Sequence, residues 1–272
     1  MRYKLFAFDL DGTLLDDKKQ LSAANLRALH EIEEAGCIVA FATGRIGSSV
    51  QRYLPKGLSR MALLTLNGAE VWAGTDRDAT RVYYAPLASE RADFLLDHGR
   101  DAPFALNYYI DDGLYAVRTE KSMPWIDLYV RQTSSVYHFE ASLDRFRGRH
   151  PSKIIFVGSP PVLDEQQKHF KELWGDSVYI CRTWDYYLEF LNPKANKASG
   201  LEALADAYGI SLSDVAAFGD AENDIPMLRK AGLGVAMANA EPEVKVAAGR
   251  VSRWTNNEDG VAREWEEIKK SG

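Results

Sequence analysis

A buried apolar run that ends on two carboxylates constrains this chain more than any other feature. Leu5 to Phe8 carries only apolar side chains, as a buried strand does, and Asp9 and Asp11 follow it directly. Two carboxylates this close repel each other unless a cation or a shared proton relieves them. The stretch therefore predicts a strand that delivers an aspartate pair to a metal-assisted site, with one Asp as nucleophile and the other as acid/base.

Strand-like and helix-like patterns alternate in the first part of the chain. Further apolar runs occur at Cys37 to Ala42 and Ala62 to Leu66, and apolar residues recur at helical spacing after Ser22, a potential N-cap. Strands joined by helices favour a parallel, doubly wound sheet with right-handed crossovers. The pattern returns near Glu189, with strands expected at residues 214–218 and 233–237 and helices at residues 197–208, 222–230 and 259–270.

The segment between these two parts has a different character. Aromatic residues become frequent from Arg81 to about Tyr187, where short strands such as Lys153 to Val157 mix with helices such as Val162 to Trp174. Such aromatics more often pack a core or pair across strands than stack on a sugar. The change predicts an inserted α+β domain, residues 81–187, within a Rossmann-like α/β core of residues 1–80 and 188–272.

Composition and charge are those of an ordinary soluble globular protein. The 272 residues are 46% apolar and 26% charged, which is enough for two domains. The net charge of -6 argues against nucleic acid as a partner, and no apolar run approaches the ~20 residues of a membrane span. Without a signal-peptide pattern, and with Cys37 and Cys181 outside any CxxC spacing, we expect a cytoplasmic protein.

Polar side chains stand at the carboxyl ends of the predicted core strands, where sites form in open parallel sheets. Four aspartates there make an acidic cluster suited to Mg²⁺, a hard ion that carboxylate oxygens bind. Thr43 offers a hydroxyl donor, and Lys197 offers a compact positive charge. This set suits phosphoryl transfer, because the ion, the lysine and the backbone N–H groups of the Gly12 turn meet the charge of the anion. The four aspartates are Asp9, Asp11, Asp220 and Asp224.

At four motifs, in order along the chain, the sequence resembles the haloacid dehalogenase (HAD) superfamily. The motifs are DLDGT at residues 9–13, TGR at residues 43–45, Lys197, and GDAEND at residues 219–224. Three further stretches, at residues 67–69, 237–240 and 256–261, make the match closer to the Cof-type branch of sugar-phosphate phosphatases. The resemblance implies a large C2-type cap that closes over the mouth of the site, selects the substrate and excludes bulk water.

The resemblance also implies a role for each motif residue. Asp9 is the nucleophile, which forms an aspartyl-phosphate, and a metal ligand. Asp11 is first the acid and then the base, and its backbone carbonyl rather than its side chain binds Mg²⁺. Asp220 ligates Mg²⁺ directly, and Asp224 either supports the metal site or orients Lys197. The implied phosphate-binding residues are Thr43, Gly44, Lys197 and Asn223.

Several charged residues near these motifs have more than one interpretation. Lys194 lies close to Lys197, but the family places its lysine eight residues after the acid that ends the preceding strand, here Glu189, which selects Lys197. Arg45 is either a substrate contact or a salt-bridging surface residue. The charge run from Asp16 to Lys19 is typical of a solvated loop.

Together these features predict a Mg²⁺-dependent phosphatase that hydrolyses small phosphate monoesters, with sugar phosphates as the expected class. Two alternatives stay open. In a phosphomutase or phosphotransferase, the aspartyl-phosphate would pass to another hydroxyl group. A regulatory protein would bind a phosphorylated ligand without turnover, although the intact Asp9 and Asp11 pair argues against it. The expected partner is a small phosphorylated metabolite, with no expectation about oligomeric state.

Overall fold

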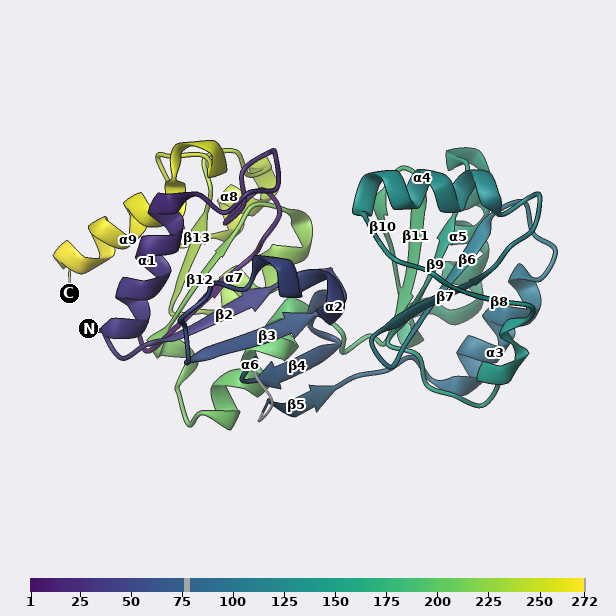
Figure 1. Cartoon of the computed structure of the whole chain (residues 1–272), viewed down its shortest axis with the longest axis horizontal. Helices are drawn as coiled ribbons and strands as arrows, with labels where there is room; N and C mark the ends of the chain where they lie inside the picture. Colours follow the sequence, from purple (N-terminus) through teal and green to yellow (C-terminus); the bar gives the residue numbers. More distant parts are fainter. Residues whose placement is uncertain (76–78, 272) are drawn as a thin grey trace. The chain divides into compact units, whose positions relative to one another are not determined.

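The computed structural model describes residues 1–75 and 79–271 and divides into two compact units (Figure 1). The core unit comprises Met1–Tyr84 and Asn196–Gly272, and the insert unit comprises Ala85–Ala195. The insert unit begins four residues and ends eight residues later in the chain than the expected domain, residues 81–187. The reason is strand pairing: β5 (Thr80–Tyr84) pairs with a core strand, whereas β11 (Tyr187–Leu191) pairs with two insert strands.

One sheet organises the core unit, with strands in the order β14-β13-β12-β1-β2-β3-β4-β5. The pairs from β14 to β3 are parallel, and β4 and β5 continue the sheet with antiparallel pairing. Because β12, β1, β2 and β3 are parallel neighbours, their carboxyl ends lie at one edge of the sheet. The strands are β1 (Leu5–Phe8), β2 (Ile38–Ala42), β3 (Met61–Thr65), β4 (Glu70–Ala73), β5 (Thr80–Tyr84), β12 (Val215–Gly219), β13 (Leu233–Ala236) and β14 (Arg250–Val251).

Helices cover both faces of the core sheet, which confirms the predicted doubly wound architecture. Strand β1 supplies both faces, because Phe6 and Phe8 join the apolar cluster that contains Trp265 of α9, whereas Leu5 and Ala7 join the cluster under α6. Helices α1 and α9 contact each other on the first face (Figure 1). The helices are α1 (Ala23–Glu34), α2 (Gly47–Val50), α6 (Lys197–Ala207), α7 (Ile225–Lys230), α8 (Pro242–Ala247) and α9 (Gly260–Ser271).

A second sheet organises the insert unit, in the order β10-β11-β9-β6-β7-β8, and it confirms the predicted α+β character. Its pairs are antiparallel except β7 with β8. Helices α3 and α5 pack on one face around Phe156 and Phe170, and α4 contacts β6 and β9. The elements are α3 (Ser89–Gly99), β6 (Ala105–Ile110), β7 (Gly113–Val117), α4 (Met123–Thr133), β8 (His138–Glu140), β9 (Lys153–Val157), α5 (Pro160–Trp174), β10 (Tyr179–Trp184) and β11 (Tyr187–Leu191).

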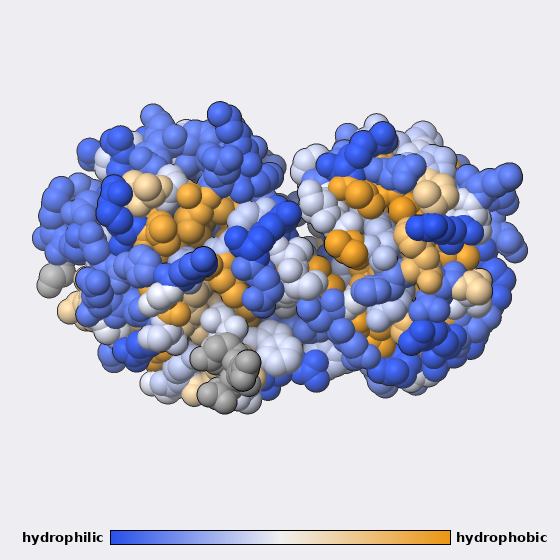
Figure 2. All heavy atoms as spheres, viewed as in Figure 1, coloured by the Kyte–Doolittle hydropathy of each residue, from blue (hydrophilic) through white to orange (hydrophobic). Residues whose placement is uncertain are grey.

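Hydrophilic residues dominate the drawn face of both units, and apolar residues reach it only in small areas (Figure 2). The large apolar side chains are mainly buried in the clusters just described. Among the described residues, no helix is both long enough and apolar enough to cross a membrane.

A buried ion pair lies on the insert sheet, on the face away from the Phe156 cluster. Lys153 Nζ is 2.9 Å from Glu189 Oε2, and the two side chains are only 4% and 7% exposed. Thr183 donates a hydrogen bond to the other carboxylate oxygen of Glu189 at 2.8 Å, and the ring of Tyr109 lies 5.1 Å from the lysine nitrogen. Removing one partner of such a pair leaves a buried charge without its counter-ion.

We expect Lys153→Met to lower the free energy of unfolding of the insert unit by about 3–5 kcal/mol, because Glu189 would keep a buried charge. The double variant Lys153→Met, Glu189→Leu should recover most of that loss, since no charge is then left unpaired. Urea unfolding followed by fluorescence measures both. A single variant within about 1 kcal/mol of the wild type would show that the pair behaves like a surface pair.

Candidate active site

Lys197 lies at the centre of a group of buried charges in the core unit. It is the first residue of α6, and the side chain of Asn196 caps that helix by accepting the Ser199 N–H. The Lys197 side chain is fully buried, and its Nζ lies 2.6 Å from Asp9 Oδ1 and 2.5 Å from Asp224 Oδ1. The Asp9 N–H donates to the carbonyl of Phe218, which fixes this residue at the end of β1 beside β12.

Asp224 connects this lysine to the turn that follows β12. Its Oδ1 accepts from Lys197, and its Oδ2 accepts the backbone N–H groups of Asp220 and Ala221, each at 3.0 Å. Both oxygens are therefore engaged within the protein. Of the two roles implied for Asp224, orienting Lys197 is the one these hydrogen bonds favour.

Three carboxylates of the core unit come together as a candidate cation site. Asp9, Asp220 and Asp224 each offer an oxygen, and these atoms lie within 4.8 Å of one another. Burial raises the pKa of Asp9 well above its ordinary value, although the charge of Lys197 opposes the shift. Burial also raises the pKa of Asp220, to about 6, against the hydrogen bond from Thr13. When all three are ionised, the carboxylates and the single ammonium leave two negative charges in excess, and such an oxygen donor set fits a hard divalent cation such as Mg²⁺.

Gly12 lets the chain turn tightly beside Asp220. Its φ is +90°, and an added Cβ would lie 2.3 Å from Asp220 Oδ2. Its carbonyl accepts a hydrogen bond from Asn239 Nδ2 at 2.8 Å, and Thr13 Oγ1 donates to Asp220 Oδ1 at 2.7 Å. The turn thus depends on a residue without a side chain, and it positions one of the three carboxylates.

Asp11 has different partners from Asp9, although only one residue separates them. Arg45 Nε lies 2.6 Å from Asp11 Oδ2, Arg45 Nη2 lies 2.7 Å from Oδ1, and Lys19 Nζ lies 2.8 Å from Oδ1. Burial would raise the pKa of Asp11, but the hydrogen bonds and charges of Arg45 and Lys19 hold it at about 2. The Asp11 side chain is thus outside the three-carboxylate group, and Arg45 forms a salt bridge within the site with a side chain only 16% exposed.

Asn67 connects the candidate phosphate-binding residues after β2 and β12. It adopts the left-handed region, with φ of 58°, and its Oδ1 accepts from Asn223 Nδ2 at 2.9 Å. A Cβ added at Gly44 would lie 3.0 Å from the same oxygen. The buried Thr43 accepts the Arg45 N–H at its hydroxyl oxygen, 3.2 Å away. Asn67 thus orders a turn and also brings Gly44 and Asn223 together.

Three residues at this site received no role from the sequence: Lys19, Thr13 and Asn239. Thr13 and Asn239 stand within or beside recognised motifs, so their positions offered a signal. Lys19 offered none, because its charge run is typical of a solvated loop. Lys194, the alternative to Lys197, is exposed and belongs to the insert unit.

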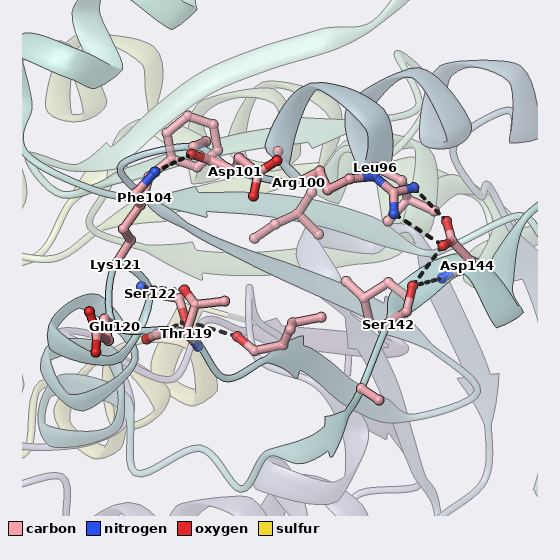
Figure 3. A pocket seen from close by; sticks show the side chains of 16 residues that line it. Leu96, Arg100, Asp101, Phe104, Thr119, Glu120, Lys121, Ser122, Ser142 and Asp144 are labelled. Carbon is pink, nitrogen blue, oxygen red and sulfur yellow. Dashed lines mark hydrogen bonds and ion pairs between the residues drawn. The ribbon is translucent and has the colours of Figure 1, made fainter.

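A cavity of about 450 Å³ in the insert unit contains none of these residues (Figure 3). Several of its polar groups contact one another: Arg100 with Asp144 at 2.8 Å, the Ser142 hydroxyl with Asp144 at 2.8 Å, and Lys121 Nζ with the backbone carbonyl of Asp101 at 3.0 Å. The three-carboxylate group and Lys197 lie in the core unit and not in the insert unit that forms this cavity.

Residues 6–264 match the family model of haloacid dehalogenase-like hydrolases. The chain belongs to this family. HMP-PP phosphatase of Yersinia pestis (strain Pestoides F) is 32% identical to this hydrolase over 244 residues, 89% of this chain and 86% of that protein. A haloacid dehalogenase-like hydrolase from Bacteroides thetaiotaomicron superposes with a TM-score of 0.87 and 27% identity, covering 98% of this chain and 99% of that one.

A further solved structure bears on the fold. The sugar phosphatase BT4131, of HAD subclass IIB, superposes with a TM-score of 0.78 at 22% identity and covers 98% of this chain and 99% of that one, so it supports the fold alone. The family match and the relatives named as phosphatases confirm the predicted superfamily and the prediction of an enzyme of the phosphatase class. The roles of individual residues stay predictions.

We expect Mg²⁺ to raise the melting temperature of the wild type, because a divalent cation meets the excess negative charge of the three carboxylates. At about 100 times Kd the expected stabilisation is about 2.7 kcal/mol. Asp220→Asn should lose most of this response, whereas Asp206→Asn, an exposed position on α6, should keep it. An unchanged response in Asp220→Asn, measured by thermal unfolding with and without Mg²⁺, would contradict the assignment of the cation site.

Gly12→Ala should weaken Mg²⁺ binding at least about tenfold, because its Cβ displaces the carboxylate of Asp220. Gly148→Ala is the matched control: Gly148 also has positive φ, but an added Cβ there meets nothing within 4 Å. The control should lower the free energy of unfolding by only about 1 kcal/mol, through backbone strain, and should leave the affinity for Mg²⁺ unchanged. Calorimetric titration with Mg²⁺ compares the two, and equal affinity in Gly12→Ala and wild type would show that Asp220 is not held by this turn.

Proposed function

We propose that this hydrolase is a Mg²⁺-dependent phosphatase that hydrolyses small phosphate monoesters, with sugar phosphates as the expected class, through an aspartyl-phosphate on Asp9. The observation that carries the proposal is the buried contact of Asp9 with Lys197 beside the other two carboxylates. Relatives named HMP-PP phosphatase support the phosphatase class. A sugar phosphatase of similar fold agrees with the substrate class without establishing it.

In this proposal Asp9 attacks phosphorus from a fixed position. Lys197 holds one oxygen of Asp9 and opposes the effect of burial on its charge. The cation would be held by Asp9, Asp220 and the backbone carbonyl of Asp11, and Asp224 would support this site through Lys197 and the turn after β12. When bound, it supplies positive charge that offsets the charge of the phosphoryl oxygens. Such a nucleophile divides one difficult hydrolysis into two easier steps.

Asp11 moves the proton in both steps. In the first step the Asp9 oxygen bonds to phosphorus, the ester P–O bond breaks, and the leaving oxygen takes a proton from Asp11. In the second step a water attacks phosphorus, gives a proton to Asp11 and releases phosphate from Asp9. Because Arg45 and Lys19 contact both oxygens of Asp11 and hold its pKa at about 2, Asp11 is ionised in this arrangement. One of these contacts must therefore open, and Asp11 must take up a proton from solvent, before it faces the leaving oxygen.

The remaining residues hold the phosphoryl group in the proposal. Thr43, Gly44 and Asn223 follow two strands that flank β1, so they adjoin the carboxyl end where Asp9 stands. The buried Lys197 offers its positive charge to the phosphoryl group. Arg45 is proposed to contact the substrate. Selection of the substrate by the insert unit stays a prediction that rests on the family resemblance.

We expect Asp9→Asn to abolish phosphate release, and chelation of Mg²⁺ to do the same to the wild type, because the nucleophile and the compensating charge are then lost. Asp206→Asn makes the same change at an exposed position and should keep full activity. Phosphate release is scored as kcat/KM over a panel of phosphate monoesters with Mg²⁺. Acid quenching followed by peptide mass spectrometry should find phosphate on Asp9. Normal turnover in Asp9→Asn would contradict the proposed mechanism.

The same panel separates the alternatives. Transfer of the phosphoryl group to an added sugar, with little free phosphate, would indicate a phosphotransferase or phosphomutase. Binding of phosphorylated ligands without any phosphate release would indicate a regulatory protein.

A further inference from the structure

We propose that Lys19 and Arg45 form an anion-binding pair that favours esters whose leaving group carries its own negative charge. The proposal rests on the proposed function, because it assigns a substrate preference to the same site. It begins from a residue that the sequence places in an ordinary solvated loop and that the structure places on Asp11.

The turn that carries Lys19 holds it in an unfavourable backbone conformation. Lys19 has φ of 59°, a region that costs an L-residue about 1–2 kcal/mol and that favours glycine or asparagine. Asp16 fixes the turn, because its carbonyl accepts the Lys19 N–H at 2.9 Å and its side chain accepts the Gln20 N–H at 2.8 Å. A lysine is therefore not what the turn itself requires.

Asp17, two residues before Lys19, makes its hydrogen bonds with two asparagines near the C-terminus. Asp17 accepts hydrogen bonds from Asn256 and Asn257 on its two carboxylate oxygens, and its own N–H donates to Asn257. These contacts tie the loop to the segment before α9. Lys19 itself forms a salt bridge to Asp11, at 2.8 Å.

The charges at Asp11 do not balance. Arg45 alone contacts both oxygens of this single carboxylate, and Lys19 adds a second positive charge. Tyr53 stacks near Arg45, with its ring 5.1 Å from the guanidinium carbon, and adds no formal charge. Counted over its direct contacts, the group therefore has one positive charge in excess, whereas the Lys197 group has two negative charges in excess when its carboxylates are ionised; Asp17 and Asp9 act on Lys19 and Arg45 without a direct salt bridge. The Lys19 side chain is 48% exposed, so its ammonium can reach an incoming anion.

The excess positive charge lies where the leaving group of the substrate would bind. In the proposed mechanism Asp11 protonates the leaving oxygen, so cations that contact Asp11 flank the leaving group. The transferring phosphoryl group, in contrast, is met by Lys197 and the cation. An anionic group close to the leaving oxygen would take the charge of Lys19 and Arg45 and would free Asp11 to face that oxygen.

A matched pair of substrates tests this preference: 2-phosphoglycolate and 2-hydroxyethyl phosphate differ only by a carboxylate in place of a hydroxymethyl group. We expect wild type to prefer phosphoglycolate. Lys19→Gln should lower kcat/KM for phosphoglycolate about fivefold relative to hydroxyethyl phosphate, as removal of one partly exposed ion pair does. Because Lys19 also contacts Asp11, both values of kcat/KM respond to the variant, and the readout is a fall of about fivefold in their ratio. Lys19→Arg should restore the preference, and Lys18→Gln, the adjacent exposed lysine, should leave both values unchanged.

The outcomes are distinct. An equal fall for both substrates in Lys19→Gln, or no change in their ratio, would overturn the proposal, and thermal unfolding checks that the variant is folded. If wild type turns over neither substrate nor any other ester, the proposed function fails instead. Calorimetric binding of phosphoglycolate then decides: a Kd that rises about fivefold in Lys19→Gln supports the anion-binding pair, and an equal Kd overturns it.

Discussion

The buried ammonium of Lys197 is the interaction on which the rest of this structure depends. A fully buried lysine is costly unless carboxylates meet it closely, and Asp9 and Asp224 do so at 2.6 and 2.5 Å. These partners are 188 and 27 positions away in the chain. The contact therefore exists only when β1, α6 and the turn after β12 have assembled, so the packing that forms the core sheet also forms the site.

Charge is segregated over a very short stretch of chain. Asp9 ends a strand and belongs to the buried negative group, whereas Asp11 belongs to a positive group that solvent partly reaches. The strand ends at Phe8 and the Gly12 turn follows, so the two carboxylates do not share one environment as alternate residues of a strand would. Two residues of the same type can therefore have different proposed roles, because their neighbours differ.

Much of the core unit could be predicted because periodicity reports burial. Apolar runs placed β1, β2 and β3 within a residue or two, and the polar residues at their ends pointed to one edge of the sheet. Strands β5 and β11 were assigned to the wrong side of a boundary, because pairing partners distant in sequence leave no trace in a short aromatic run. Lys19 was missed for a related reason: its contact depends on a left-handed turn, and local charge patterning carries no signal for that.

Both groups at the site remain electrostatically unbalanced within the protein itself. Three buried carboxylates that face one ammonium carry an uncompensated charge, which is costly inside a protein. The excess negative charge of the Lys197 group matches a divalent cation. The excess positive charge of the Asp11 group matches an anion. A phosphate ester bound with a cation would correct both at once, since its phosphoryl group would meet Lys197 and the cation while its leaving group meets Lys19 and Arg45. In the proposed function, the uncompensated charge of the site would supply its affinity for both ligands.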